Sequence, residues 1–328
     1  MVRWGAYVVA RAPALLAAAL VLAPAGCIDL GGLAGERQPL EETVVFGSSG
    51  PKLLLLEIQG PITGYEQPGL IGPGTEGTVA RVREQLQQAA REEVRGILLR
   101  VDSPGGGASA SEVIYRQLLA FKQQRGVPIV AHVMSTAASG GYYVSMAADE
   151  IRAYPTSVTG SIGVVAFGVN VVGLMEKLGV ENQTLTSGDF KDAGSPLRKM
   201  DDAEREHMQS IVDDLHARFR EVVVAGRPKL AVDRVAALAD GRVYSASQAL
   251  GHGLIDGIGD IEDSIERLQE LAGISGPSRV VSYHRASEWR NNLFTRAPRV
   301  PAVQLDLTRL LGPLPRPGFH YLWMPGFD

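Results

Sequence analysis

The residues best suited to chemistry in this chain begin with a serine displayed among small neighbours. Ser139 lies in the sequence AASGGYY, directly after an apolar run that ends at Val133. A serine placed where a strand gives way to a helix, with only Ala and Gly beside it, is sterically open and has free backbone N–H groups nearby. A helix-capping serine would need only its hydroxyl. The pattern therefore favours a nucleophile over a cap.

A serine nucleophile needs a base, and no histidine is well placed to serve. His132 precedes Ser139 on the same predicted strand, and His207 lies among charges in a long amphipathic pattern. The remaining histidines have no local motif: His216, His252, His284 and His320. A Ser-His-Asp arrangement requires an imidazole within hydrogen-bond reach of the serine, so the sequence gives it no support.

Lys191, in the sequence SGDFKDAGSP, is the candidate base. A lysine can act as a base when burial in an apolar pocket lowers its pKa from about 10.4 to between 7 and 8. Asp189 and Asp192 flank it, and nearby carboxylates would hold the ammonium charged. We therefore expect both aspartates to point away from Lys191. Taken alone, a loop lysine is usually a solvated surface charge.

Two glycine-rich turns follow predicted strands and supply further candidates. The sequence DSPGGG begins at Asp102, and its glycines let the backbone turn sharply and expose N–H groups to a cleft. Gly106 and Gly140 are the candidate donors to an oxyanion. Ser161, in TGSIG, is a candidate for orienting the lysine. Simple turn roles remain open for both segments.

Short apolar runs alternate with helical patterns along the middle of the chain, which predicts an α/β fold with a largely parallel sheet. The sequence predicts capping boxes at Ser109 and at Asp201. The predicted strands are 53–58, 96–101, 129–133, 151–154, 161–165, 183–186 and 280–283. The predicted helices are 78–92, 111–124, 171–178, 202–224, 232–239, 246–250 and 261–271. No internal linker interrupts 51–285, so these residues are predicted to form one domain.

The regions outside that domain have other compositions. Residues 1–26 resemble a signal peptide, with Arg3 and Arg11 before a short apolar stretch, and Cys27 follows in a sequence similar to a bacterial lipobox. This predicts export to the bacterial envelope and lipidation of Cys27; an ordinary cleaved signal peptide is the alternative. Residues 27–50 are predicted to be a flexible tether, and residues 286–328 a proline-punctuated tail. The net charge of −4, without a basic stripe, argues against nucleic acid as a partner.

Five motifs, in order, resemble those of the signal peptide peptidase A family of serine proteases. They are DSPGG at 102–106, AASGGYY at 137–143, TGSIGV at 159–164, FKDAGSP at 190–196, and GRVY at 241–244 leading to ALGHGLID at 249–256. The resemblance implies that Ser139 is the nucleophile and Lys191 the general base. It further implies that Ser161 orients the lysine and that Gly106 and Gly140 form the oxyanion hole.

The same resemblance implies a Clp/crotonase-like superhelix of ββα units, assembled as a ring or dome of identical subunits. It implies peptide substrates, such as residual signal peptides or apolar unfolded segments, membrane association facing the periplasm, and neither a cofactor nor a metal. Two other functions stay open at this point. One is a catalytically silent scaffold that binds peptides or partner subunits. The other is an acyl-CoA enzyme, which is disfavoured because exported compartments hold little CoA and no acidic catalytic residue lies near Gly106 or Ser139.

Overall fold

The computed structural model describes residues 39–65, 76–285, 292–294 and 318–323. The predicted signal peptide 1–26 and Cys27 lie outside these ranges, as does most of the tail 286–328.

A largely parallel sheet positions the rest of the fold, as the sequence predicts. Its strand order is β1-β11-β2-β3-β5-β6-β10, and β7 and β9 continue from the end of β5. Pairing is antiparallel only at β1–β11 and β7–β9 within the described residues. The strands are β1 (Glu41–Phe46), β2 (Lys52–Gln59), β3 (Val94–Ser103), β5 (Ile129–Ala138), β6 (Glu150–Ala153), β7 (Val158–Gly160), β9 (Val243–Ser245), β10 (Gly257–Ile258) and β11 (Arg279–His284).

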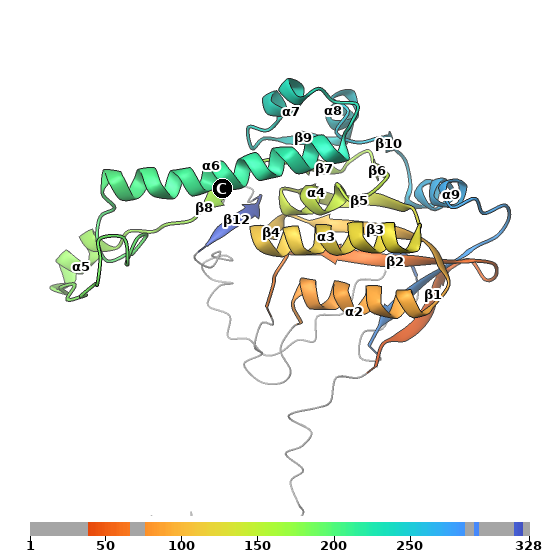
Figure 1. Cartoon of the computed structure of the whole chain (residues 1–328), viewed down its shortest axis with the longest axis horizontal. Helices are drawn as coiled ribbons and strands as arrows, with labels where there is room; N and C mark the ends of the chain where they lie inside the picture. Colours follow the sequence, from red (N-terminus) through yellow and green to blue (C-terminus); the bar gives the residue numbers. More distant parts are fainter. Residues whose placement is uncertain (1–38, 66–75, 286–291, 295–317, 324–328) are drawn as a thin grey trace, which may run out of the picture. The chain divides into compact units, whose positions relative to one another are not determined.

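Helices cover both faces of this sheet, which is why its central strands are apolar runs without alternation. Successive side chains of a strand point to opposite faces, so Leu54 and Leu56 of β2 join one core cluster, and Leu53 and Leu55 join another. The first cluster includes residues of α2, α3 and α4, the second residues of α9 (Figure 1). The helices are α2 (Thr78–Arg91), α3 (Ala108–Arg125), α4 (Gly140–Ser145), α5 (Val172–Leu178), α6 (Asp202–Gly226), α7 (Val232–Leu238), α8 (Ala246–Gly251) and α9 (Ile261–Leu271).

A second, smaller sheet lies where the glycine-rich turns end. It has the order β4-β12-β8, and both pairings are antiparallel. Its strands are β4 (Gly105–Gly107), β8 (Val165–Ala166) and β12 (Phe319–Leu322). In Figure 1 the blue arrow of β12, from the end of the chain, lies beside β4 and β8.

The structure corrects several sequence predictions. Part of the predicted tether 27–50 is the strand β1, which pairs with β11 at the sheet edge. Part of the predicted tail is β12. No strand forms over 183–186, and the predicted strand 161–165 is replaced by β7 and β8 on either side of a turn. The Ser109 capping box is wrong, because α3 begins at Ala108 after Gly107, whereas the Asp201 side chain caps α6 by accepting from the Glu204 N–H at 2.8 Å.

Candidate active site

Ser139 occupies a strained turn between β5 and α4. Its backbone angles are φ 51° and ψ −114°, which a residue with a Cβ rarely adopts. The Ser139 N–H donates to the Gly160 carbonyl at 2.7 Å, and its own carbonyl accepts from the Tyr143 N–H at 2.8 Å. Strain of this kind costs about 1–3 kcal/mol and persists only where the surroundings impose it. The turn thus fixes the direction of the serine side chain.

The Ser139 side chain is covered, contrary to the open display that its small neighbours suggest. The residue is 1% exposed, although its hydroxyl has no hydrogen-bond partner among the described residues. β12 lies against α4, the helix that begins directly after Ser139, and pairs with β4. The backbone of Gly105 and Ser103 lies against Gly140 and Gly141, so the small residues beside Ser139 make room for packed backbone rather than for solvent.

The two candidate oxyanion glycines lie where no side chain fits. A Cβ on Gly140 would lie 2.5 Å from Ser111 Oγ and 3.2 Å from the Cα of Gly105. A Cβ on Gly106 would lie 2.2 Å from the Ile62 carbonyl oxygen. Ser103 braces this turn, since its hydroxyl donates to the Gly60 carbonyl at 2.7 Å and accepts from the Gly105 N–H at 3.1 Å. The DSPGGG turn and the Ser139 turn are thus packed backbone against backbone.

Ser161 lies in the turn next to Ser139, at the end of the neighbouring strand. Gly160 of β7 pairs with Ala138 of β5, so the two serines follow paired residues. Ser161 also has a positive φ, of 50°, and its N–H donates to the Arg242 carbonyl at 2.8 Å. It is 7% exposed. The structure therefore places both serines together, in strained and mostly buried turns.

Lys191 is not part of this arrangement. It lies in an exposed turn, where its N–H donates to the Gly188 carbonyl at 3.1 Å, and no described side chain bonds its ammonium group. Asp192 is turned toward Arg198, which holds it with hydrogen bonds of 2.9 and 2.8 Å. Arg198 also binds the buried Glu204 at 2.6 Å, and these bonds lower the pKa values of both carboxyl groups.

The histidine before Ser139 has a different role from that of a catalytic base. His132 is fully buried, its Nδ1 lies 2.7 Å from Ser264 Oγ, and its ring meets Tyr154 edge-on. Burial, with a further contribution from Arg152, lowers its pKa to about 4. Among the described residues, no histidine side chain is hydrogen-bonded to Ser139.

Comparison with known proteins shows the family to which this chain belongs. Residues 121–275, which include Ser139, Ser161 and Lys191, match the model of peptidase family S49. A protein of Enterococcus faecium whose assigned name is signal peptide peptidase SppA is 34% identical over 301 residues, which cover 88% of this chain and 86% of that protein. The chain belongs to peptidase family S49. This S49 chain is accordingly a serine peptidase with the predicted α/β fold.

One further relative is longer than this chain. Protease 4 of Salmonella typhi is 33% identical over 209 residues, which cover 64% of this chain but 32% of that protein. A solved membrane-bound stomatin-specific protease aligns with a TM-score of 0.40 at 16% identity and covers 67% of this chain and 85% of its own.

An aromatic cluster that includes Tyr143, four residues after Ser139, is a feature that sequence reasoning missed. Tyr321 of β12 is 2% exposed, its ring stacks on Tyr143 with centroids 5.0 Å apart, and Phe219 of α6 lies 4.8 Å away. The Tyr321 hydroxyl donates to the Leu215 carbonyl at 2.8 Å, and burial raises its pKa to about 12. The aromatic run FHYLW at 319–323 could have indicated a strand, because aromatic residues favour strands.

The Tyr143 hydroxyl anchors this aromatic cluster. It donates to Glu112 of α3, which also accepts from Arg218 of α6 at 3.1 Å. Burial, followed by the hydrogen bond to Glu112, raises the pKa of Tyr143. The hydroxyl therefore stays protonated, and the ring that contacts Tyr321 is held in place.

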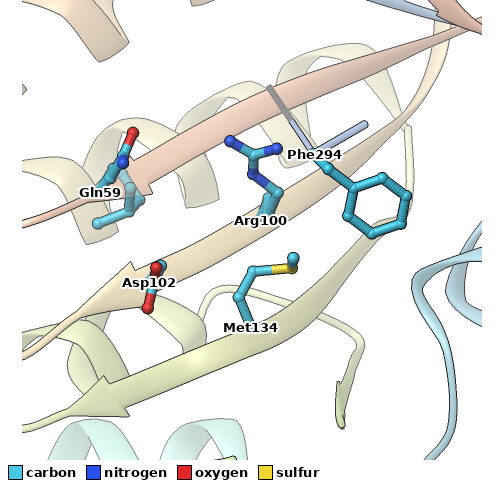
Figure 2. A pocket seen from close by; sticks show the side chains of 6 residues that line it. Gln59, Arg100, Asp102, Met134 and Phe294 are labelled. Carbon is cyan, nitrogen blue, oxygen red and sulfur yellow. The ribbon is translucent and has the colours of Figure 1, made fainter. Parts of the chain in front are cut away.

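A separate small pocket lies over β2, β3 and β5 (Figure 2). It encloses about 30 Å³, room for about two water molecules. Its lining residues are Ile58, Gln59, Arg100, Asp102, Met134 and Phe294. None of the candidate catalytic residues Ser139, Ser161 and Lys191 lines it.

Within the described ranges, no group of three or more His, Cys, Asp or Glu side chains is arranged to hold a metal ion. In the same parts of the chain, no helix has both the length and the apolar content needed to cross a membrane.

Proposed function

We propose that the chain is a serine endopeptidase in which Ser139 attacks the peptide carbonyl and Lys191 is the general base. The observation that carries the proposal is the strained turn of Ser139, packed against the glycines of the DSPGGG segment. A strained serine turn beside backbone N–H groups suits acyl transfer, because the hydroxyl and the oxyanion donors share one rigid support.

The reaction begins when the Ser139 hydroxyl passes its proton to the Lys191 amine. The oxygen bonds to the carbonyl carbon, and the Gly106 and Gly140 N–H groups bind the resulting oxyanion. The protonated lysine then donates to the leaving amine as the C–N bond breaks. Water adds to the acyl-enzyme by the same route, which regenerates the serine and releases the new carboxyl group.

Lys191 must approach Ser139 for the proton transfer to occur. Its loop is exposed, which allows such a rearrangement. The loop is tied at one side by Arg198 to Asp192 and Glu204, which keeps those carboxylates away from the ammonium. Ser161, one strand from Ser139, is the hydroxyl that would receive and orient the amine. Packing against a second copy in a ring or dome would bury the loop and exclude water from its lysine.

The proposed substrates are residual signal peptides or apolar unfolded segments at a bacterial envelope membrane. The name of the Enterococcus faecium relative supports this class of substrate. The predicted export signal, together with lipidation of Cys27, would place the enzyme on the periplasmic side. Both of these features belong to residues 1–38, outside the described part of the chain.

A catalytically silent scaffold is the second candidate, favoured by the exposed position of Lys191 and the covered Ser139. Hydrolysis of a fluorogenic peptide separates the two functions. Ser139→Ala and Lys191→Ala should each abolish hydrolysis, Lys191→Arg should not rescue it, and Lys177→Ala, an exposed lysine of α5, should leave it unchanged. A fluorophosphonate should label Ser139 in the parent chain. Unchanged hydrolysis in both alanine variants would contradict the dyad.

A further inference from the structure

The carboxylate of Glu112 joins three helices. Glu112 lies in the second turn of α3, the helix that begins directly after the strand β4. One of its carboxylate oxygens accepts from the Tyr143 hydroxyl of α4, and the other accepts from Arg218 of α6 at 3.1 Å. The side chain of Glu112 is 23% exposed and that of Arg218 38%, so water and salt screen this ion pair only in part.

Tyr143 extends this junction to the nucleophile turn. Its N–H donates to the Ser139 carbonyl at 2.8 Å, and its ring packs on Phe219 of α6 with the centroids 4.9 Å apart. Burial of Glu112 opposes its ionisation, but the hydrogen bonds from Tyr143, Arg116 and Arg218 lower the pKa of its carboxyl group. Glu112 is therefore a carboxylate at neutral pH and accepts from both neighbouring helices.

The helix α6 connects the junction to the loop that carries Lys191. Near its start, the buried Glu204 is bound by Arg198 of that loop at 2.6 Å. Position 218 follows position 204 by 14 residues, which corresponds to about 21 Å along a helix. Residues 205–214 between the two ion pairs are exposed or half-buried. The direction of this part of α6 is therefore set by contacts near its ends.

We propose that Glu112 is a positioning residue of this peptidase. Through Arg218 it sets the direction in which α6 presents the Lys191 loop, and through Tyr143 it holds the turn of Ser139. The inference rests on the proposed function, since it takes Ser139 as the nucleophile and Lys191 as the base. No hydrogen bond joins Glu112 to either of them in the described part of the chain, so Glu112 acts through its partners.

Arg116 offers a matched control, because it binds the same carboxylate without joining two helices. Its Nε donates to Glu112 at 2.5 Å from the next turn of α3, and its side chain is 69% exposed. Arg116→Gln and Arg218→Gln each remove one guanidinium group from Glu112, and only the second releases α6. Glu221→Gln removes the other carboxylate bound to Arg218, which is 68% exposed.

Hydrolysis of a fluorogenic peptide by the full chain tests the positioning role. Arg218→Gln should lower kcat about tenfold, because small displacements of catalytic groups slow the reaction, and should leave KM within about twofold. Arg218→Lys keeps a charged donor and should recover most of the loss. Adding Glu112→Gln to Arg218→Gln should lower kcat no further, because the two residues act as one unit. Arg116→Gln and Glu221→Gln should match the parent chain.

Three kinetic results would overturn the inference. The first is an equal loss of kcat in Arg116→Gln and Arg218→Gln, which would make the charge around Glu112 the cause rather than the link to α6. The second is a rise in KM with kcat unchanged. The third is a double variant whose loss is the product of the two single losses.

Amide hydrogen exchange separates this inference from the peptidase proposal. Residues 205–218 should exchange at least threefold faster in Arg218→Gln than in the parent chain, and at the parent rate in Arg116→Gln. Equal thermal midpoints would show that each variant is folded. A parent chain that hydrolyses no peptide would contradict the peptidase proposal, and faster exchange in Arg218→Gln would still support the attachment of α6. Equal exchange in the parent and Arg218→Gln chains would overturn the positioning role even in an active peptidase.

Discussion

Ser139 and Ser161 are joined through Gly160, whose carbonyl accepts from the Ser139 N–H at 2.7 Å while Ser161 follows it directly in the chain. They are the two residues other than glycine with positive φ in the described part of the chain. Each serine follows one of two paired strands, and the same turns hold both of them in their unusual backbone conformation. The strain is thus a property of the site rather than of either residue alone.

Ser139→Gly should be more stable than Ser139→Ala by about 1 kcal/mol. Glycine adopts φ 51° without a Cβ clash, which outweighs its larger entropy in the unfolded chain. Urea unfolding of both variants gives the difference directly, since neither retains the hydroxyl. An alanine variant as stable as the glycine variant would show that the turn is unstrained.

Gly140→Ala should slow fluorophosphonate labelling of Ser139 by about 100-fold, because the methyl group would meet Ser111 Oγ and displace one oxyanion donor. Gly173→Ala is the matched control, since a Cβ there meets no atom within 4 Å. Labelling rates equal in the two variants would remove Gly140 from the oxyanion hole. Circular dichroism would verify that both chains are folded.

Much of this site could be predicted from sequence because its signals are local. The central strands are apolar runs, and Ser139, Gly140 and Gly106 lie in short motifs at strand ends. The position of β12 could not be predicted, since pairing of residues 320–322 with 105–107 depends on contacts more than 200 positions apart. The burial of Ser139 was missed because it depends on backbone packing between separate turns. The edge strand β1 was missed because its flanks are rich in Gly, Ser and Glu.

The turn that carries Lys191 illustrates another limit. The sequence of the turn gives the neighbours of the lysine. It does not show that Asp192 forms an ion pair with Arg198, a residue that belongs to no motif, instead of with the lysine. The exposure of Lys191 likewise follows from the course of residues 181–200, which form no helix or strand. The motif around Lys191 therefore identifies the lysine, but it does not give the distance between the lysine and Ser139.

His132 should make the chain lose stability as the pH falls from about 6.5 to about 4. Burial lowers the pKa of the folded-state imidazole to about 4, so over this range the unfolded chain binds a proton that the folded chain does not. The loss reaches about 3 kcal/mol. Urea unfolding at several pH values should show a shallower decline for His132→Asn. Parallel curves for the two chains would contradict the assignment.

Arg198→Gln should loosen the loop that carries Lys191. The variant leaves the buried Glu204 carboxylate without its ion pair and releases Asp192, which can then approach the lysine ammonium. We expect faster trypsin cleavage after Lys191 and Lys199 and slower peptide hydrolysis. Arg242→Gln, which breaks an exposed pair with Asp240, is the control and should change neither rate.

The same loop should loosen in acid. Hydrogen bonds from Arg198 lower the folded-state pKa values of Asp192 and Glu204, so their contribution is complete above the ordinary carboxyl pKa of about 4 and is lost as the pH falls through the lowered values. Amide hydrogen exchange of residues 188–200, corrected for intrinsic rates, should accelerate below pH 4 in the parent chain. Arg198→Gln should exchange rapidly at every pH, and a parent-like pH dependence in that variant would show that Arg198 does not hold the loop.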